Sequence, residues 1–351
     1  MLLEPITLGT LKLRNRIVVS PMCQYSSPGG VPTDWHLVHL GSRAVGGAGL
    51  VFTEATSVAP EGRISPEDTG IWNERQVEAW SRIASFIRGQ GAAAGIQLAH
   101  AGRKASTDAP WRGGKPLDAE HGGWTPVAPS AIPFDVGHST PVALDANGIA
   151  RIIEDFRAAA QRARDAGFDV IEVHAAHGYL LHQFLSPLSN TRTDAYGGSL
   201  ENRARLLRAM IAAVRESWPA PMPLWVRLSA TDWAEGGWDI GECVQLARML
   251  RADGVDAIDC SSGGTVPHPK VPVGPGYQVP FAARIRREAG IATSTVGLIT
   301  EPRQAEEILQ RGDADVIEMA REFLRDPYFP RRAAKELGES IRAPEQYARA
   351  W

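Results

Sequence analysis

Cysteine is scarce in this chain of 351 residues. Its three cysteines, Cys23, Cys243 and Cys260, lie far apart in the sequence and form no CxxC pair. An odd number of cysteines at such spacings excludes a disulfide scaffold. It also excludes a zinc site or an iron–sulfur cluster held by cysteine thiolates.

Neither an excess of charge nor a long apolar run is present. The formal net charge of −3 gives no electrostatic reason to expect nucleic acid or an anionic membrane as a partner. No apolar run reaches about 18 residues, and the opening MLLEPITLG carries neither a basic flank nor a cleavage site. We therefore expect a cytoplasmic protein. Hydrophobic residues make up 44% of the chain, which is enough for a large core.

Short apolar runs rich in β-branched residues recur along the chain, and most are followed by a helical pattern. The eight runs are residues 17–21, 50–55, 95–99, 170–173, 224–228, 257–259, 293–296 and 316–319. Amphipathic stripes predict helices at 149–163, 200–214, 240–250 and 302–309, with Ser199 as the N-cap of the second. Strands that are apolar on both faces and alternate with helices predict a single-domain α/β (β/α)8 TIM barrel over residues 1–351. An open doubly wound sheet is the alternative, but no GxGxxG follows the first strand.

Three segments fall outside the regular repeat. Residues 2–15 carry Gly9 and Thr10 between two apolar triplets, which predicts a hairpin that closes the barrel floor. Residues 102–142 and 263–280 are long connections after the third and sixth strands. Both leave the carboxyl ends of strands, so we expect both to cover the active face.

Polar rings gather where the fourth strand ends. His174 and His177 follow its apolar residues, and Tyr179 comes next but one. Three such rings at the end of a buried strand are typical of a site at the carboxyl face of a barrel. A histidine near a core is more often a satisfied structural residue, so the assignment depends on what surrounds these side chains.

Other strand ends carry groups suited to a phosphate and to a flat heterocycle. The loops after the last two strands commonly bind phosphate in barrels, and there Gly297 allows close backbone approach while Arg321 can bind an anion with two donors. Across the barrel mouth, Gln97 and Arg227 offer amide and guanidinium donors for a ring edge. A phosphate clamp opposite a planar, edge-reading site fits flavin mononucleotide (FMN).

Other barrel functions are weaker alternatives. His174 and His177 have the spacing of metal ligands, so a metal-dependent hydrolase is one alternative. No acidic residue at another strand end joins them in a clear signature, and we expect Glu54 and Glu172 to point away from the site. No lysine stands at a strand end, which disfavours a Schiff-base aldolase. A non-catalytic binding barrel is disfavoured because the polar residues converge on one face.

Residues 174–203, HAAHGYLLHQFLSPLSNTRTDAYGGSLENR, closely resemble the signature of the Old Yellow Enzyme family of flavin-dependent ene-reductases. Residues 20–27, SPMCQYSS, are similar to its thermophilic-like or xenobiotic-reductase branch, and the similarity covers essentially the whole chain. The resemblance implies a TIM barrel with tightly bound, non-covalent FMN. It also implies that NADPH or NADH reduces the flavin, which then reduces the C=C bond of an α,β-unsaturated carbonyl compound in a ping-pong cycle.

The resemblance also assigns roles to particular residues. His174 and His177 would bind the substrate carbonyl, Tyr25 would touch the ligand from the other side, and Tyr179 would be the proton donor. The residues implied for FMN are Ser20, Pro21, Met22, Cys23, Ala55, Gln97, Arg227, Gly297, Ala320 and Arg321. No metal is implied.

The resemblance further predicts a homodimer or homotetramer. In this branch the C-terminal segment, here residues 338–351, reaches a neighbouring subunit, so Arg349 and Trp351 would belong to another protomer's site. Two positions depart from the family pattern: Ala320 stands where glycine is usual, and Val296 stands where some xenobiotic reductases have tryptophan. Dienoyl-CoA reductase-like flavoproteins are a related alternative, but they carry a cysteine cluster that this chain lacks.

Overall fold

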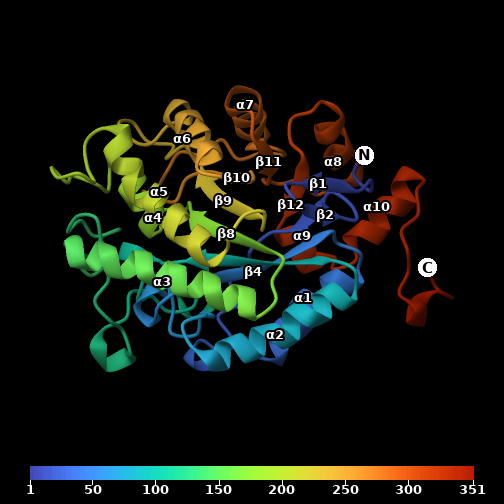
Figure 1. Cartoon of the computed structure of the whole chain (residues 1–351), viewed down its shortest axis with the longest axis horizontal. Helices are drawn as coiled ribbons and strands as arrows, with labels where there is room; N and C mark the ends of the chain where they lie inside the picture. Colours follow the sequence, from blue (N-terminus) through green and yellow to red (C-terminus); the bar gives the residue numbers. More distant parts are fainter.

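Eight parallel strands close into a barrel in the computed structural model, which describes residues 1–351 (Figure 1). Around the barrel, strands that follow one another in the sequence are also neighbours in space, which confirms the predicted TIM barrel. The barrel strands are β3 (Ile17–Val19), β4 (Leu50–Ser57), β5 (Ala93–Ala99), β8 (Val170–Ala175), β9 (Leu224–Ser229), β10 (Ala257–Ser261), β11 (Ala292–Thr295) and β12 (Val316–Met319).

Every predicted strand is present, with ends that differ by at most two residues. The first is shorter than predicted, because Pro21 has no N–H to donate to a neighbouring strand. The last hydrogen bond between this strand and the eighth strand runs from the Ser20 N–H to the Met319 carbonyl, at 3.0 Å. The chain therefore leaves the sheet at Ser20, and residues 21–25 are free to run across the barrel mouth.

Helices cover the outside of the barrel (Figure 1). The four predicted helices are confirmed as α3, α5, α6 and α8, and Ser199 caps α5 by accepting the Asn202 N–H at 3.4 Å. The helices are α1 (Asp34–Val45), α2 (Glu74–Gly89), α3 (Ala146–Asp165), α4 (Leu180–Leu185), α5 (Leu200–Ser217), α6 (Ile240–Ala252), α7 (Val279–Ala289), α8 (Pro302–Gln310), α9 (Arg321–Arg325) and α10 (Phe329–Leu337). No helix is both long and apolar enough to cross a membrane.

The predicted N-terminal hairpin is confirmed as β1 (Ile6–Leu8) paired with β2 (Leu11–Leu13). Its leucines pack against inward-facing residues from the first half of the barrel strands, among them Leu50, Val170 and Trp225. The amino-terminal end of the barrel interior is therefore dry and apolar, and the hairpin closes it.

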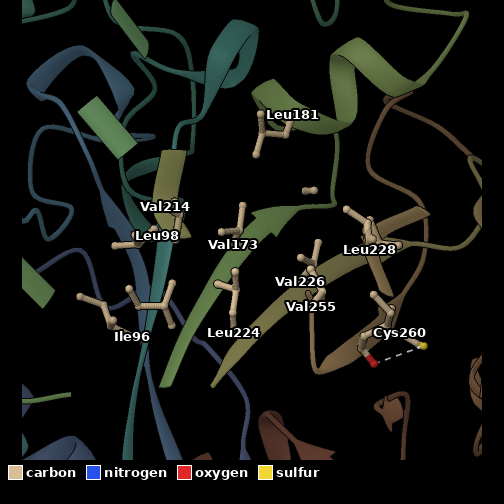
Figure 2. Close-up of a cluster of buried hydrophobic side chains, with 14 of the residues drawn as sticks. Ile96, Leu98, Val173, Leu181, Val214, Leu224, Val226, Leu228, Val255 and Cys260 are labelled. Carbon is tan, nitrogen blue, oxygen red and sulfur yellow. Dashed lines mark hydrogen bonds between the residues drawn. The ribbon is translucent and has the colours of Figure 1, made fainter. Parts of the chain in front are cut away.

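A second, larger apolar core lies between the strands and the surrounding helices. Figure 2 shows part of it, in which Ile96, Val173 and Val226 of β5, β8 and β9 belong to the same buried cluster as Leu181 of α4 and Val214 of α5. Because side chains alternate along a strand, the residues between these positions face the barrel interior. Those inward positions include Gln97, Glu172, His174 and Arg227 on the same three strands.

Two long loops cover the carboxyl face, as predicted. Residues 102–142 contain three short 3-10 helices and end in β7 (Val142–Ala143), which pairs with β6 (Val127–Ala128). The buried Arg103 guanidinium donates to the Thr265 carbonyl at 2.7 Å, which ties this loop to the loop at residues 263–280. The two covers of the active face are thus held together.

Candidate active site

Strand register places the predicted ring-edge residues at one level of the barrel. Gln97 of β5 is aligned with Ala55 of β4 and with Glu172 of β8. Arg227 of β9 is aligned with His174 of β8 and with Asp259 of β10. Residues that the sequence places up to about 200 positions apart therefore form one ring around the barrel mouth, as carboxyl ends of parallel strands do.

Three buried carboxyl groups lie directly around Arg227. Ligand oxygens of Glu172, Asp259 and Glu318 all lie within 4.8 Å of one another, and all three residues are fully buried. Arg227 Nε is 2.7 Å from Asp259 Oδ2, and Gln97 Nε2 donates to Glu172 Oε1 at 2.7 Å. The expectation that Glu172 points away from the site is wrong, because residues 172 and 174 share one face of the strand.

Burial and mutual repulsion change the protonation of this cluster. Burial and the Asp259 charge raise the pKa of Glu318 to about 8, and the same causes raise the pKa of Glu172 well above its usual range. Burial alone would lower the pKa of Arg227, but the surrounding carboxyls outweigh it and raise that pKa. The guanidinium therefore stays charged at the barrel mouth, where it can face an electron-rich ring edge.

The three predicted catalytic rings do come together. The His174 ring centroid lies 5.1 Å from that of His177 and 5.0 Å from that of Tyr179, both in edge-to-face geometry. His174 Nδ1 accepts the Ala176 N–H at 3.2 Å, so the proton of the neutral ring is on Nε2. His177 Nε2 lies 2.6 Å from Ser261 Oγ. His174 Nε2 and His177 Nδ1 have no protein partner and are left for a ligand.

All three rings are neutral near pH 7. Burial and the nearby Arg227 charge lower the pKa of both histidines well below the usual range. Burial also raises the pKa of the Tyr179 phenol well above 10. Two neutral imidazole donors beside a protonated phenol can stabilise negative charge on an oxygen and deliver one proton.

A buried pair that the sequence reasoning missed supports the turn carrying these rings. His182 Nδ1 accepts the Gly178 N–H at 2.9 Å, and its Nε2 lies 3.1 Å from Asp232 Oδ1. Burial would raise the pKa of Asp232, but hydrogen bonds from His182 and Ser186 outweigh it and lower that pKa to about 2. The carboxylate therefore holds His182, and His182 holds the turn between His177 and Tyr179.

Five non-glycine residues have positive φ, and each follows a barrel strand at the carboxyl face: Tyr25, Ser106, His177, Trp233 and Leu298. The left-handed region costs a non-glycine residue about 1–3 kcal/mol, and such strain concentrates at functional sites. Two of the five, Tyr25 at φ +47° and His177 at φ +59°, are predicted substrate-binding residues.

The end of β3 brings Cys23 and Tyr25 over the same region. Glu54 Oε2 accepts the Gln24 N–H at 2.9 Å, and Glu54 Oε1 lies 3.0 Å from His36 Nε2 of α1. Glu54 thus points away from the barrel interior, as expected, yet it fixes the segment that carries Cys23. Burial raises the pKa of the Cys23 thiol well above its usual range, so this sulfur is a neutral thiol at neutral pH.

Lys104 is a second site residue that the sequence reasoning missed, since it stands in a loop rather than at a strand end. Its ammonium donates to the His177 carbonyl at 2.9 Å and lies 5.1 Å from the Tyr179 ring centroid. Burial and the neighbouring Arg103 lower its pKa to about 8. Lys104 ties the long loop to the turn that carries the three predicted catalytic rings.

The predicted phosphate residues Gly297, Ala320 and Arg321 line one pocket of about 190 Å³, and Arg227 lines it as well. Gly297 has φ +132°, and an added Cβ would lie 3.1 Å from the Tyr277 ring, so only glycine fits here. The pocket thus offers backbone and guanidinium groups to an anion and connects them to the ring-edge donors. These residues fit FMN.

The C-terminal residues lie outside this site. Trp351 packs on Arg331 of α10, with the guanidinium carbon 4.5 Å from the ring centroid, and Arg349 is exposed. In Figure 1 the C-terminal segment extends away from α10 along one side of the molecule. The assignment of Arg349 to a site therefore stays a prediction about a second subunit.

Fold and site together define a class of protein: a parallel barrel that binds a phosphate-bearing planar cofactor beside two neutral histidines and a tyrosine. A profile of the NADH:flavin oxidoreductase / NADH oxidase family matches residues 1–340. The chain is 53% identical over 346 residues to an NADPH dehydrogenase of Listeria innocua, covering 98% of this chain and 97% of that protein. It is 49% identical over 352 residues to an NADPH dehydrogenase of Bacillus subtilis, covering 100% and 99%.

Solved structures agree with these relatives. Morphinone reductase in complex with tetrahydroNAD matches with a TM-score of 0.80 at 30% identity, covering 98% of this chain and 92% of that one. A 2-naphthoyl-CoA reductase matches with a TM-score of 0.88 at 26% identity over 95% of this chain, which spans only 52% of that longer chain.

The chain belongs to the NADH:flavin oxidoreductase / NADH oxidase family, and the predicted Old Yellow Enzyme resemblance is confirmed. It is an FMN-dependent oxidoreductase that uses a nicotinamide nucleotide. The alternative of a metal-dependent hydrolase is not favoured, because no third histidine, cysteine or carboxylate completes a ligand set with His174 and His177.

Proposed function

We propose that this enzyme reduces the C=C bond of α,β-unsaturated aldehydes and ketones. The observation that carries the proposal is the convergence of His174, His177 and Tyr179, with ring centroids 5.0 and 5.1 Å apart and all three rings neutral. Two oxygen-directed donors beside one proton donor are what a conjugated carbonyl needs. A nicotinamide amide offers a similar oxygen, so NADPH or NADH and the alkene would occupy this place in turn.

The histidines bind and polarise the substrate. His174 Nε2–H donates to the carbonyl oxygen, and His177 donates from Nδ1 when its Nε2 accepts the Ser261 hydroxyl proton. Both hydrogen bonds become stronger as negative charge develops on that oxygen. Removing one such donor typically costs about 2.7–4 kcal/mol of transition-state stabilisation. Their low pKa keeps them from trapping the charge as a permanent ion pair.

Tyr179 supplies the proton. Its hydroxyl makes no hydrogen bond within the protein, and its buried phenol is protonated at neutral pH. When bound, FMN supplies the hydride that it has received from the nicotinamide nucleotide. Tyr179 then protonates Cα from the face opposite to that hydride, which gives net trans addition.

A second subunit completes the proposed assembly. The exposure of Arg349 supports the proposal that it enters the site of a neighbouring copy. A homodimer or homotetramer would then have sites built from two chains.

Isotope labelling tests the reaction. Turnover of 2-methylcyclohexenone with 4-deuterated NADPH should place deuterium at Cβ, and turnover in D2O should place it at Cα on the opposite face. Deuterium at the carbonyl carbon would contradict the proposal, because it would mean reduction of C=O instead.

Tyr179→Phe tests the donor. Reoxidation of the reduced enzyme by 2-cyclohexenone should slow by about 10²–10⁴-fold, the usual contribution of a positioned general acid. Tyr196→Phe is the matched control, since Tyr196 packs on Phe184 away from the three rings, and it should reoxidise at the wild-type rate.

A further inference from the structure

Behind Tyr179 lies a buried carboxyl group that the proposed reaction does not use. Asp68 is 1% exposed and stands in the turn that follows residues 60–65. Its Oδ2 accepts the Ile64 N–H at 2.6 Å and the Ser65 N–H at 3.2 Å. Its Oδ1 is buried without any hydrogen-bond partner. Such an oxygen is rare in folded proteins and requires an explanation.

The carboxyl group of Asp68 lies close to the proposed proton donor. Asp68 and Tyr179 line the same small cavity of about 10 Å³, together with Ser57, Ala99 and Ala101. A cavity of this size is at the lower limit for one water molecule, about 10–15 Å³. Asp68, Ser57 and Tyr179 among its lining residues carry polar side-chain groups, which a buried water needs as partners.

We propose that Asp68 is the proton reservoir for Tyr179, connected to it by one water molecule in this cavity. The inference rests on the proposed role of Tyr179 as proton donor. Two backbone N–H groups hold Oδ2, so the proton is on Oδ1, which is the oxygen without a protein partner.

The protons balance as follows. The Tyr179 O–H bond breaks and a C–H bond forms at Cα, using the electron pair of the substrate enolate. The water gives a proton to the tyrosinate oxygen, and the Asp68 O–H bond breaks to restore the water. Asp68 is left as a carboxylate and regains a proton from solvent before the next turnover. The relay avoids a lasting tyrosinate in a site where burial strongly disfavours it.

The surroundings of Asp68 keep it protonated. Burial and the Glu54 charge raise its pKa to about 8, against the two backbone N–H groups and Arg63, which lower it. The other titratable groups that it influences are Cys23, Tyr25 and Tyr179, all of which are neutral at that pH. At neutral pH the carboxyl therefore still carries the proton that the relay requires.

Asp68→Asn tests the relay, because the amide can still accept the two N–H groups but cannot supply a proton. Reduction of the holoenzyme by NADPH should change by less than about twofold, whereas reoxidation by 2-cyclohexenone should slow about tenfold or more. Asp68→Glu keeps an ionisable proton and should recover most of the rate. Unchanged reoxidation in Asp68→Asn, or equal slowing of both half-reactions, would overturn the relay.

Two further readouts separate a relay from a structural role. The double variant Asp68→Asn/Tyr179→Phe should be no slower than Tyr179→Phe, because the two groups act in series. A proton inventory in H2O–D2O mixtures should be curved for the wild type and linear for Asp68→Asn. Normal reoxidation by Tyr179→Phe itself would instead refute the proposed donor.

Protonation of Asp68 can be followed without turnover. A carboxyl whose pKa is raised on folding stabilises the fold below its unfolded pKa, and this stabilisation is lost as pH rises through the folded pKa. The Tm of the wild type relative to Asp68→Asn should therefore fall between about pH 4 and about pH 8. A pH-independent difference would show that Asp68 holds no proton. Should Asp68→Asn not fold, Ala101→Val is the second variant. Its larger side chain reduces the space for water in the cavity, so it should slow reoxidation by 2-cyclohexenone and leave reduction by NADPH unchanged.

Discussion

At the scale of single residues, Arg227 compensates the charge of the polar half of the barrel interior. It lies 2.7 Å from Asp259 and within 4.0 Å of Glu318, and Glu172 adds a third carboxyl group. None of these side chains is more than 6% exposed, so water cannot replace the guanidinium. The residue therefore has two proposed tasks: it compensates charge in the carboxyl cluster, and we propose that it faces the ring edge of the cofactor.

Arg227→Ala leaves Asp259 without its ion-pair partner inside the buried carboxyl cluster. We expect the apoprotein to lose about 3–5 kcal/mol of unfolding free energy in urea, the usual cost of removing one partner from a buried ion pair. Arg208→Ala is the matched control, because Arg208 is 46% exposed in its pair with Asp253 and should cost less than about 1 kcal/mol. Equal losses in the two variants would contradict this account of the cluster.

Cys23 is also predicted to contact the flavin ring, but unlike Arg227 it contributes a neutral thiol and no charge. Cys23→Ala should leave FMN bound and shift the flavin reduction potential, measured by anaerobic dye equilibration. An apoprotein from this variant would show that the thiol is needed for binding, and an unchanged potential would show that it is inert.

At the scale of elements, the turn between β8 and α4 sets the catalytic geometry. Gly178 has φ +72°, and an added Cβ would lie 2.1 Å from the Gly264 carbonyl oxygen. The turn and the loop after β10 are therefore in direct backbone contact. That contact and the His182–Asp232 pair both restrain the turn that carries His177 and Tyr179.

Gly178→Ala should displace this turn. We expect enone reoxidation to fall by about 10²-fold, since a misplacement of roughly 1 Å has that effect on a positioned catalytic group. Gly236→Ala is the matched control: its φ is +70°, but nothing lies within 4 Å of the added Cβ. A Gly178→Ala enzyme no slower than Gly236→Ala would mean that the contact with Gly264 does not position the rings.

The elements were predictable because their signals are local. Apolar runs, amphipathic stripes and caps such as Ser199 act within a few residues, and the carboxyl ends of parallel strands meet at one face. Lys104 was not predictable, because its partners His177 and Gly264 are 73 and 160 residues away. The same holds for Asp68, whose turn folds back to a cavity beside Tyr179. Glu172 was predicted to point away from the site, although side chains two residues apart on a strand share one face and His174 was placed in the site.

At the scale of the whole molecule, the C-terminal segment packs on α10 and not on the barrel strands. Arg331 donates to the Ala350 carbonyl at 2.9 Å and stacks on Trp351, but the residues between 344 and 350 are largely exposed. We propose that these residues become buried against a neighbouring subunit, as the proposed shared site requires.

Deletion of residues 343–351 should leave a folded, yellow barrel with a smaller mass by light scattering. The KM for 2-cyclohexenone should rise about tenfold or more, since a hydrogen bond from a charged group contributes roughly 1.5–3 kcal/mol. Arg349→Ala should raise KM while the mass stays that of the wild type. Unchanged mass and KM in the truncated chain would contradict a site shared between subunits.

The most direct test of the central claim is an anaerobic spectral titration of the purified protein. Flavin absorption should bleach on addition of one equivalent of NADPH and return on addition of 2-cyclohexenone, with cyclohexanone as the product. Bleaching without recovery would keep the flavin oxidoreductase but contradict the proposed reduction of conjugated alkenes.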